Sequence, residues 1–576
     1  MTASIEEKVQ RLELLHRIGV ALSAERNRDR LVETILLEAK ALCHADGGTL
    51  YLVEDDALHF AMVHNDTLGI AEGGTTGRPV SLPPIPLRGP DGRPNERNVA
   101  SYCAVHRRSV NIPDAYDARG FDFSGTRAFD ARNAYRSRSF LTIPMVDNEG
   151  RVIGVLQLIN ARDPATSAIV PFDEDRQRIV EALASQAAVA LDNQMLLEGQ
   201  KALLESFIQL IAAAIDAKSP YTGKHCERVP ILTFMLAQAA CEANDGPFKD
   251  FRLTEEEWYE LRIAAWLHDC GKIVTPVHVM DKATKLETIF DRIALIRARF
   301  ALLEREAEIR HLQRVAAGAD PVESAARRDG ERFALRDDLA FLERCNIGGE
   351  FLSDEDRARI AAIGARRWRD GDVERPLLEP DEIECLSVRR GTLTDAERLI
   401  INGHMVETIK MLEALPFPRH LRRVPEYAGG HHERMDGRGY PRGLFAGDMS
   451  IPARIMAIAD VFEALTAQDR PYKKGKTLSE TMKIMAAMKR DNHLDPDLLD
   501  LFVTSGVYKE YARRYLPPDL IDEVDEREIL ETKPRPFELP PEEVRRARWG
   551  SFLPEYQTTR SSLVPELPQR SGPLGR

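Results

Sequence analysis

Two stretches of the 576-residue chain carry the strongest signal about its fold and chemistry. Residues 266–272 read Trp-Leu-His-Asp-Cys-Gly-Lys, and residues 430–441 read Gly-His-His-Glu-Arg-Met-Asp-Gly-Arg-Gly-Tyr-Pro. An adjacent His-Asp pair on a helix can direct an imidazole and a carboxylate toward one ion, and the carboxylate has a second oxygen for another ion. These stretches therefore predict a metal centre.

Three further clusters supply candidate ligands on either side of these stretches. They are Asp216–His225, Asn402-Gly-His404 and Ile458-Ala-Asp460. So many ligands would be redundant for one tetrahedral zinc ion and suit two octahedral ions. The predicted metal ligands are His225, His268, Asp269, His404, His431, His432 and Asp460.

The ordered set, with Gly271-Lys272, Gly439-Tyr440-Pro441 and Arg470-Pro-Tyr-Lys473, resembles the HD-GYP family, a branch of the HD phosphohydrolases, over residues 200–520. The resemblance implies an all-α helical bundle. It also implies a metal-dependent phosphodiesterase that hydrolyses the bacterial second messenger cyclic di-GMP to the linear dinucleotide pGpG, to GMP, or to both. Cyclic di-GMP is thus the expected substrate.

The resemblance also assigns roles to individual residues. One metal would be held by His225, His268, Asp269 and Asp460, and Asp269 would bridge to a second metal held by His404, His431 and His432. Asp269 and Lys272 are the expected catalytic residues. Lys272 lies four positions after His268, on the same face if one helix carries both, and would neutralise charge that develops on the phosphate. The substrate would be bound by Lys272, Tyr440, Arg470 and Lys473.

The number of metals follows from a departure from the family pattern. Members with three metals carry a Glu four residues before the first His, where this chain has Tyr221. A neutral phenol is a poor ligand for a hard ion, so two divalent metals are expected. Iron or manganese is favoured, and the nitrogen and oxygen ligands also admit nickel or zinc. Cys226 and Cys270 adjoin ligands but point about 100° away around a helix, so packing is expected for them.

The first part of the chain resembles a GAF domain over residues 8–196. The resemblance rests on the opening helices, on Ser109–Ala115, on the hairpin around Asp147–Gly150, and on a closing helix after Phe172. It implies an α+β fold, an antiparallel sheet with flanking helices, that senses an unknown small molecule and regulates the enzyme. Cyclic-nucleotide binding is a weaker alternative, because Ala161 replaces the family's Lys after Asn160. Cys103 with His106 favours packing over chromophore attachment.

One long helix, residues 175–215, is expected to join the two halves. From Val180 the chain repeats apolar residues at alternating spacings of three and four as far as Ile215, with Gln194 and Lys201 as exceptions. Two interpretations remain open: the core helices of both domains run together, or a parallel coiled coil forms a homodimer through residues 180–215.

An insertion interrupts the catalytic domain, and a proline-rich tail follows it. In family members a short segment links the His-Asp helix to the helix that bears the next ligand. In this chain residues 287–388 interrupt that segment, and their pattern predicts amphipathic helices. This insertion is either a helical hairpin on the bundle or a lid or partner surface that controls access to the metals. Residues 525–576 are rich in proline and poor in aromatic residues, and disorder is expected there.

Composition narrows the possible partners. The net charge is −13, so no overall positive field attracts a nucleic acid polymer or an anionic membrane. The chain shows no long apolar span and no apolar leader, which predicts a cytoplasmic protein without a membrane partner. Seven scattered cysteines without a CxxC pair argue against disulfides.

The sequence thus predicts a multidomain GAF-regulated phosphodiesterase. Two alternatives stay open. The first is a nucleotide-responsive signalling scaffold with weak catalysis. The second is a phosphodiesterase for another cyclic dinucleotide such as cyclic GMP-AMP, because base choice depends on pocket contacts that the chain does not reveal.

Overall fold

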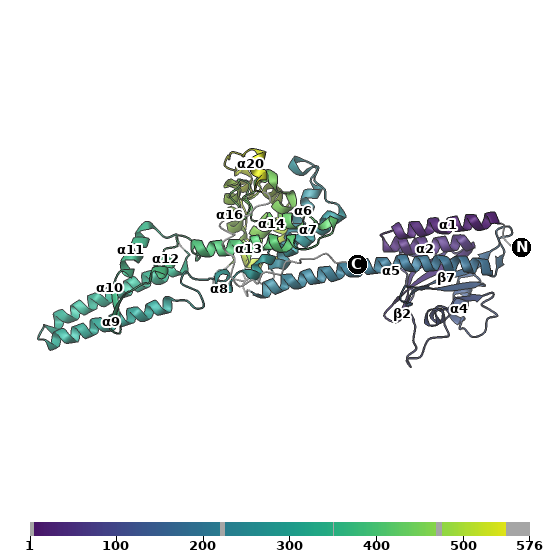
Figure 1. Ribbon diagram of the computed structural model, residues 1–576, viewed down its shortest axis with the longest axis horizontal. Coiled ribbons are helices and arrows are strands. Elements are labelled where there is room, and N and C mark those ends of the chain that lie inside the picture. The colour runs from purple at the N-terminus through teal and green to yellow at the C-terminus, as the bar shows by residue number, and fades with distance from the viewer. Residues whose placement is uncertain (1–4, 219–224, 350, 468–474, 549–576) are drawn as a thin grey trace, which may run out of the picture. The chain divides into compact units, whose positions relative to one another are not determined.

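A computed structural model describes residues 5–218, 225–349, 351–467 and 475–548 (Figure 1). The chain forms two compact units that divide between Leu204 and Glu205. The first unit contains an antiparallel sheet and the second is mainly helical, as the sequence predicts. Among the described helices, none is long and apolar enough to cross a membrane.

The first unit is built on one antiparallel sheet with the strand order β3-β2-β1-β7-β6-β5. The strands are β1 Ala45–Glu54, β2 Ala57–Asn65, β3 Ile70–Gly73, β4 Ile85–Pro86, β5 Val110–Ile112, β6 Phe140–Val146, β7 Val152–Arg162 and β8 Ile169–Val170, of which β4 pairs with β2 and β8 with β7. The predicted hairpin joins β6 to β7. Its turn is held by the Asp147 carboxylate, which accepts hydrogen bonds from the backbone N–H groups of Glu149 and Arg151 at 2.9 and 2.8 Å.

Helices cover this sheet. They are α1 Ile5–Ala24, α2 Arg28–Cys43, α3 Val99–His106, α4 Ser124–Asn133 and the first part of α5 Glu174–Lys218. Helices α1, α2 and α5 lie together on one face (Figure 1), where Ile35, Leu156 and Leu183 form part of a buried core. On the other face Cys103 of α3 is buried against Val155, as expected for a packing residue.

The second unit is a bundle around a separate core. Its helices are α6 His225–Glu242, α7 Glu255–Leu267, α8 Val277–Met280, α13 Asp395–Glu413, α14 Val424–Gly429, α15 Ile451–Thr466, α16 Leu478–Arg490, α17 Pro496–Thr504 and α18 Val507–Tyr515, and the 3-10 helix η3 is Cys270–Val274. Leu236, Leu261, Met456 and Phe502 are fully buried between them. Helix α13 begins at a capping box, in which the Thr394 and Glu397 side chains satisfy each other's backbone N–H groups, and this fixes the start of a helix that carries a predicted ligand.

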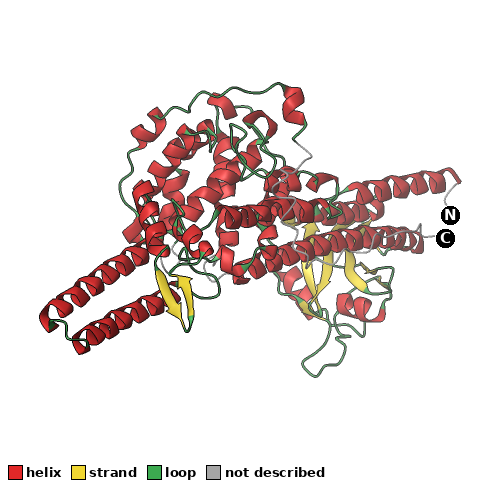
Figure 2. Cartoon of the chain, turned by 60° about the vertical axis from the view of Figure 1, so that its left-hand side comes forward, coloured by secondary structure: helices red, strands yellow, loops and turns green. Residues whose placement is uncertain are grey.

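The predicted insertion, residues 287–388, has its own core. It comprises α9 Ile293–Ala316, α10 Pro321–Ile347, α11 Asp354–Gly364, the strands β9 Arg367–Asp370 and β10 Val373–Pro376, and α12 Pro380–Leu386. Helices α9 and α10 form an antiparallel pair, and a two-stranded hairpin lies near its base (Figure 2). Phe300, Leu342 and Leu377 are buried within this segment. Its ends meet, because the Lys285 ammonium donates to the carbonyl oxygens of Leu386 and Val388 at 3.1 and 2.7 Å.

The expectation of a disordered tail is wrong for residues 525–548. Helices α19 Glu526–Glu531 and α20 Glu542–Arg546 form there, and Ile529 is buried in the bundle core. Arg545 makes an ion pair with the buried carboxylate of Asp448. The Arg548 guanidinium donates to the carbonyl oxygen of Gly443 at 3.0 Å. Composition alone suggested disorder, but these partners lie about a hundred residues earlier in the chain.

Candidate metal centre

The seven predicted metal ligands come together from five separate parts of the second unit. His225 begins α6, and His268 follows the last residue of α7. Asp269 precedes η3, and His404 lies within α13. The pair His431-His432 follows α14, and Asp460 lies within α15. Only the folded bundle therefore creates the centre.

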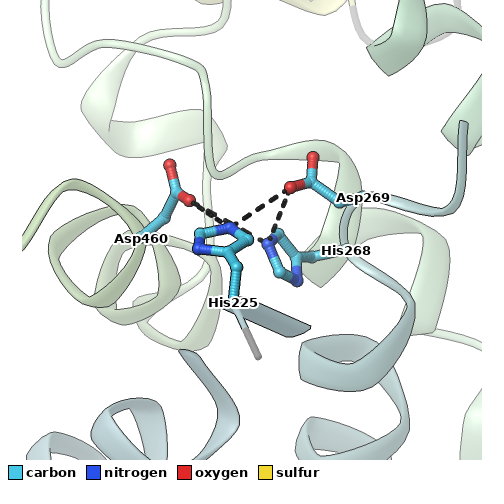
Figure 3. A group of neighbouring side chains, drawn as sticks. All are labelled: His225, His268, Asp269 and Asp460. Carbon is cyan, nitrogen blue, oxygen red and sulfur yellow. Dashed lines mark ion pairs between the residues drawn. The ribbon is translucent and has the colours of Figure 1, made fainter. Parts of the chain in front are cut away.

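Four of these residues form a first group (Figure 3). The Asp269 Oδ2 atom lies 3.4 Å from His225 Nε2 and 3.2 Å from His268 Nε2. The Asp460 Oδ1 atom lies 3.2 Å from His225 Nε2 and 3.9 Å from His268 Nε2. Two imidazoles and two carboxylates thus face one point, and all four side chains are buried.

A second group shares Asp269 with the first. Its other oxygen, Oδ1, lies 3.2 Å from His404 Nε2 and 3.9 Å from His431 Nε2. Potential ligand atoms of Asp269, His431 and His432 all lie within 4.8 Å of one another. The two oxygens of Asp269 therefore face different sets of histidines, which is the arrangement expected of a bridging carboxylate.

The donor atoms of these histidines fit a metal. The Nε2 atoms of His225, His268, His404 and His431 and the Oδ1 atom of Asp269 are buried, and among the described residues none has a hydrogen-bond partner. The opposite ring nitrogens are occupied. The Nδ1–H group of His268 donates to the carbonyl oxygen of Ala265 at 2.8 Å, and that of His431 donates to the carbonyl oxygen of Ala428 at 2.6 Å. This fixes the tautomer that leaves the Nε2 lone pair directed inward, as metal-binding histidines require.

The protonation states of Asp269 and His431 suit the same role, whereas, against the opposing effect of burial, Glu463, Asp269 and Asp460 raise the pKa of His225 well above its usual value. Burial would raise the pKa of Asp269, but the positive charge of Lys272 and contacts with His268 hold that pKa well below its usual value. Burial also lowers the pKa of His431 to about 4. An ionised carboxylate and a neutral imidazole are the forms that bind divalent ions.

Lys272 lies beside the centre, although it does not share a helix with His268. Helix α7 ends at Leu267, and Lys272 lies in the 3-10 helix η3, so the predicted common α-helical face is wrong. The tighter turn instead brings the Lys272 Nζ atom to 2.5 Å from Asp269 Oδ2. Asp269 and Asp460 raise the pKa of Lys272 above its usual value despite an opposing effect of burial, so its ammonium is charged.

The loop after His431-His432 is closely packed. The buried Glu433 carboxylate accepts hydrogen bonds from the backbone N–H groups of Arg442 and Leu444 at 2.8 and 2.9 Å. A Cβ atom on Gly439 would lie 2.4 Å from the backbone nitrogen of Arg434, so only glycine fits there. The loop presents Tyr440, whose ring stacks on His432 with centroids 4.9 Å apart.

Other predicted residues have varied outcomes. Arg470 and Lys473 lie outside the described residues, as does Tyr221. Cys226 and Cys270 are buried, and burial raises the pKa of Cys270 to about 12, which agrees with a packing role.

Sequence reasoning missed Glu463. This buried residue lies one turn after Asp460 on α15, and its carboxylate accepts a hydrogen bond from His225 Nδ1 and another from Arg228 Nε at 2.6 Å. A carboxylate three residues after a ligand, in a mostly apolar helix, was the available signal. Glu463 orients His225 and fixes its tautomer.

Replacing this carboxylate is expected to weaken metal binding. Glu463→Gln should raise the metal dissociation constant by about tenfold, because carboxylates that orient ligating histidines contribute 10- to 100-fold to affinity. Titration of metal-free protein with Mn²⁺ against a chromophoric chelator measures this. Glu523→Gln, at an exposed glutamate of the same unit, is the matched control. Equal affinities for the two variants would contradict the role of Glu463.

Comparisons with known proteins assign a domain family to a part of each unit. The model of the family described as "GAF domain" matches residues 27–191, and that described as "HD domain" matches residues 377–498. The chain therefore contains a GAF domain followed by an HD domain. The second match begins near the end of the insertion, so His225 and the His268-Asp269 pair precede it.

Phosphodiesterases are among the known relatives of the chain. A 3'3'-cGAMP-specific phosphodiesterase 1 from Vibrio cholerae is 43% identical over 116 residues, which are 20% of this chain and 26% of the relative. A cyclic di-GMP phosphodiesterase from Pseudomonas aeruginosa is 39% identical over 119 residues, 20% of this chain and 28% of the relative. A 3'3'-cGAMP-specific phosphodiesterase 3 from Vibrio cholerae is 23% identical over 334 residues, 56% of this chain and 44% of the relative. The matched regions thus span less than half of each of these relatives.

Proposed function

We propose that the second unit hydrolyses cyclic di-GMP, to pGpG, GMP or both, at a centre with two metal ions. The observation that carries this proposal is the Asp269 carboxylate, whose two oxygens face two sets of histidines with unpaired Nε2 atoms. The assignment of the HD-GYP type rests on the same residues and on the Gly439-Tyr440-Pro441 segment. The names of the relatives support a cyclic dinucleotide as substrate.

The residues of the centre would divide the work of hydrolysis. His225, His268, Asp269 and Asp460 would hold one ion, and Asp269, His404, His431 and His432 the other. Two bound divalent ions, of which iron or manganese is favoured, would polarise the phosphate and supply the nucleophile for in-line attack on phosphorus. The Lys272 ammonium would stabilise negative charge that develops on the phosphate oxygens. Tyr440 would line the substrate pocket, and Arg470 and Lys473 would bind the second phosphate or a guanine base.

Hydrolysis assays under anaerobic conditions, with metal analysis of the same sample, test the proposal. Cyclic di-GMP and 3'3'-cyclic GMP-AMP should be compared at equal concentrations. We expect two metals per chain and faster turnover of cyclic di-GMP. Three bound ions would contradict the two-metal centre. A preference for cyclic GMP-AMP would favour that compound as the substrate. The 43% identity to the 3'3'-cGAMP-specific phosphodiesterase 1 of Vibrio cholerae supports this alternative. Failure to hydrolyse either compound with metals bound would favour the signalling scaffold.

The GAF domain is proposed to regulate this activity through α5. A small-molecule ligand of unidentified chemistry is expected to bind the first unit. Helix α5 is continuous from Glu174 to Lys218, so it connects the two units covalently without an intervening loop.

We also propose that the protein is a homodimer through α5. The ends of the predicted repeat are buried within the units, as Leu183 and Ile215 illustrate. Between them Leu197, Leu204 and Ile211, which follow one another at spacings of seven in the same repeat, are 61%, 38% and 41% exposed. An apolar face of this kind on one helix is typical of a surface that pairs with a second copy.

Charges placed on this face should separate the subunits. The double variant Leu197→Glu, Leu204→Glu is expected to be monomeric at micromolar concentration, because it would bury two carboxylates per chain in the interface. Size-exclusion chromatography with light scattering measures the mass. Leu302→Glu, at an exposed leucine of α9, is the matched control and should stay dimeric. A monomeric unmodified protein would contradict the proposal.

Removal of the insertion distinguishes the hairpin from the lid. Because the segment has its own core and its ends meet at Lys285 and Val388, a short Gly-Ser linker in place of residues 287–388 should leave the bundle folded. We expect kcat and KM within about threefold of the full-length protein, as for the loss of a separately packed module. A tenfold change in KM would instead indicate a lid.

A further inference from the structure

The last turn of α5 contacts two segments that carry metal ligands. The Asp216 Oδ2 atom accepts a hydrogen bond from the backbone N–H of Cys226, the residue after His225, at 3.3 Å. The Lys218 ammonium donates to the backbone carbonyl oxygens of Lys272, Ile273 and Thr275 at 3.1, 2.5 and 2.6 Å. Within four residues of its end, α5 thus contacts both Cys226, the neighbour of His225, and the segment after Asp269.

The contacts of Lys218 suit its chemistry. An ammonium has three N–H donors, and here each meets a carbonyl oxygen. The carbonyls of Ile273 and Thr275 lie at and just beyond the end of η3, where a helix leaves its last C=O groups without partners inside the helix, and that of Lys272 also accepts a hydrogen bond from the backbone N–H of Thr275. A positive charge is also favourable at the C-terminal end of a helix. Lys218 therefore closes the turn that begins at Asp269.

The contact of Asp216 has the opposite polarity. Cys226 is the second residue of α6, so its N–H has no partner within that helix. A carboxylate at this end of a helix accepts such a hydrogen bond and interacts favourably with the helix dipole. Asp216 therefore fixes the start of α6, at which His225 lies.

The turn that bears these two residues is anchored in the bundle. Ile208, Ala212 and Ile215 of α5 are buried in the core of the second unit. Val180 and Leu191, near the other end of the same helix, are buried in the core of the first unit. Because α5 is one continuous helix, a displacement or rotation of its first part can be transmitted along it to Asp216 and Lys218.

We propose that Asp216 and Lys218 are positioning residues of the metal centre, and that the last turn of α5 sets the separation of His225 from Asp269. In this structure His225 Nε2 and Asp269 Oδ2 lie 3.4 Å apart. An effect of α5 on the rate of hydrolysis, as a means of regulation, rests on the proposed function. The positioning role does not, because it concerns the ligands themselves.

The variant Lys218→Met tests the role in the full-length protein, since it keeps the length of the side chain and removes the three donors. Hydrogen exchange of the backbone N–H groups of residues 270–275 should become at least about tenfold faster, because the closed turn opens more often. The dissociation constant for Mn²⁺ should rise by about tenfold, as for other residues that orient metal ligands. Turnover should fall through kcat, with KM within about twofold, because Lys218 touches no substrate group. Lys218→Arg should restore part of each effect.

The controls separate this inference from the proposed function. Lys483→Met, at an exposed lysine of α16, should change none of these quantities. Unchanged exchange and unchanged Mn²⁺ affinity in Lys218→Met would overturn the positioning role. Faster exchange and weaker binding, in a protein that hydrolyses no cyclic dinucleotide, would uphold it and reject the proposed function. If Lys218→Met does not fold, Asp216→Asn decides: faster exchange of residues 225–228 upholds the inference, and native exchange rates overturn it.

Discussion

Asp269→Asn is expected to reduce hydrolysis of cyclic di-GMP by at least ~10³-fold, which corresponds to ~4 kcal/mol of transition-state stabilisation. The substitution keeps the shape of the side chain but removes its charge and one of its two acceptor oxygens. Because those oxygens face different groups, at 3.2 Å from His268 and 3.2 Å from His404, the variant loses the bridge between the two metal sites. We therefore expect fewer than two bound metals per chain.

The measurement combines steady-state kinetics with metal analysis of the same preparation. Asp250→Asn, at an exposed aspartate before α7, is the matched control and should retain full activity. Activity within tenfold of the unmodified protein would exclude Asp269 as the bridging ligand. In a cell-based assay, a downstream output that persists without turnover would favour the signalling scaffold.

Gly271→Ala is expected to destabilise the second unit by ~3 kcal/mol or more, the upper part of the range for overpacked cores. A Cβ atom at this position would lie 2.0 Å from the carbonyl oxygen of His404 and 2.5 Å from the backbone nitrogen of Thr408. Both neighbours are backbone atoms of α13, so no side-chain rotation relieves the clash. Helix α13 must move away from η3, and this separates His404 from Asp269.

Denaturant titration followed by hydrogen exchange of α13 measures this effect within the second unit. Gly330→Ala is the matched control, because a Cβ atom on that residue of α10 meets nothing within 4 Å. It should stabilise α10 by ~1 kcal/mol, the difference in helix propensity between glycine and alanine. Native stability and metal content in Gly271→Ala would contradict the close packing of η3 on α13.

Much of the candidate site was accessible from the chain alone, because metal ligands are few in type and occur in short local patterns. The His268-Asp269 pair and His431-His432 could be recognised in this way, and the metal assignment itself stays a prediction. The periodicity around Val180 likewise indicated one helix, which is observed as α5. Alternation of apolar residues and the Asp147–Gly150 turn predicted the hairpin that is observed in the first unit.

Other features depend on contacts between distant parts of the chain. No residue near His225 in the sequence indicates its partner Glu463, which lies 238 residues later and accepts a hydrogen bond from the His225 ring. The tail was misjudged for the same reason: Arg545 is ordered by Asp448, 97 residues earlier. A local pattern also failed at Lys272, because α7 ends before His268 and a 3-10 turn replaces the expected helix.

By itself, the sequence determined which side chains are available to bind metals, and it predicted α5 and the hairpin of β6 and β7. These properties follow from residue chemistry and local periodicity. Only the tertiary structure decided that the two oxygens of Asp269 face separate histidine groups and that Lys218 closes the turn beside them. The physical reason is that distances of 2 to 4 Å between helices are set by the packing of the whole bundle, to which residues far apart in the chain contribute together.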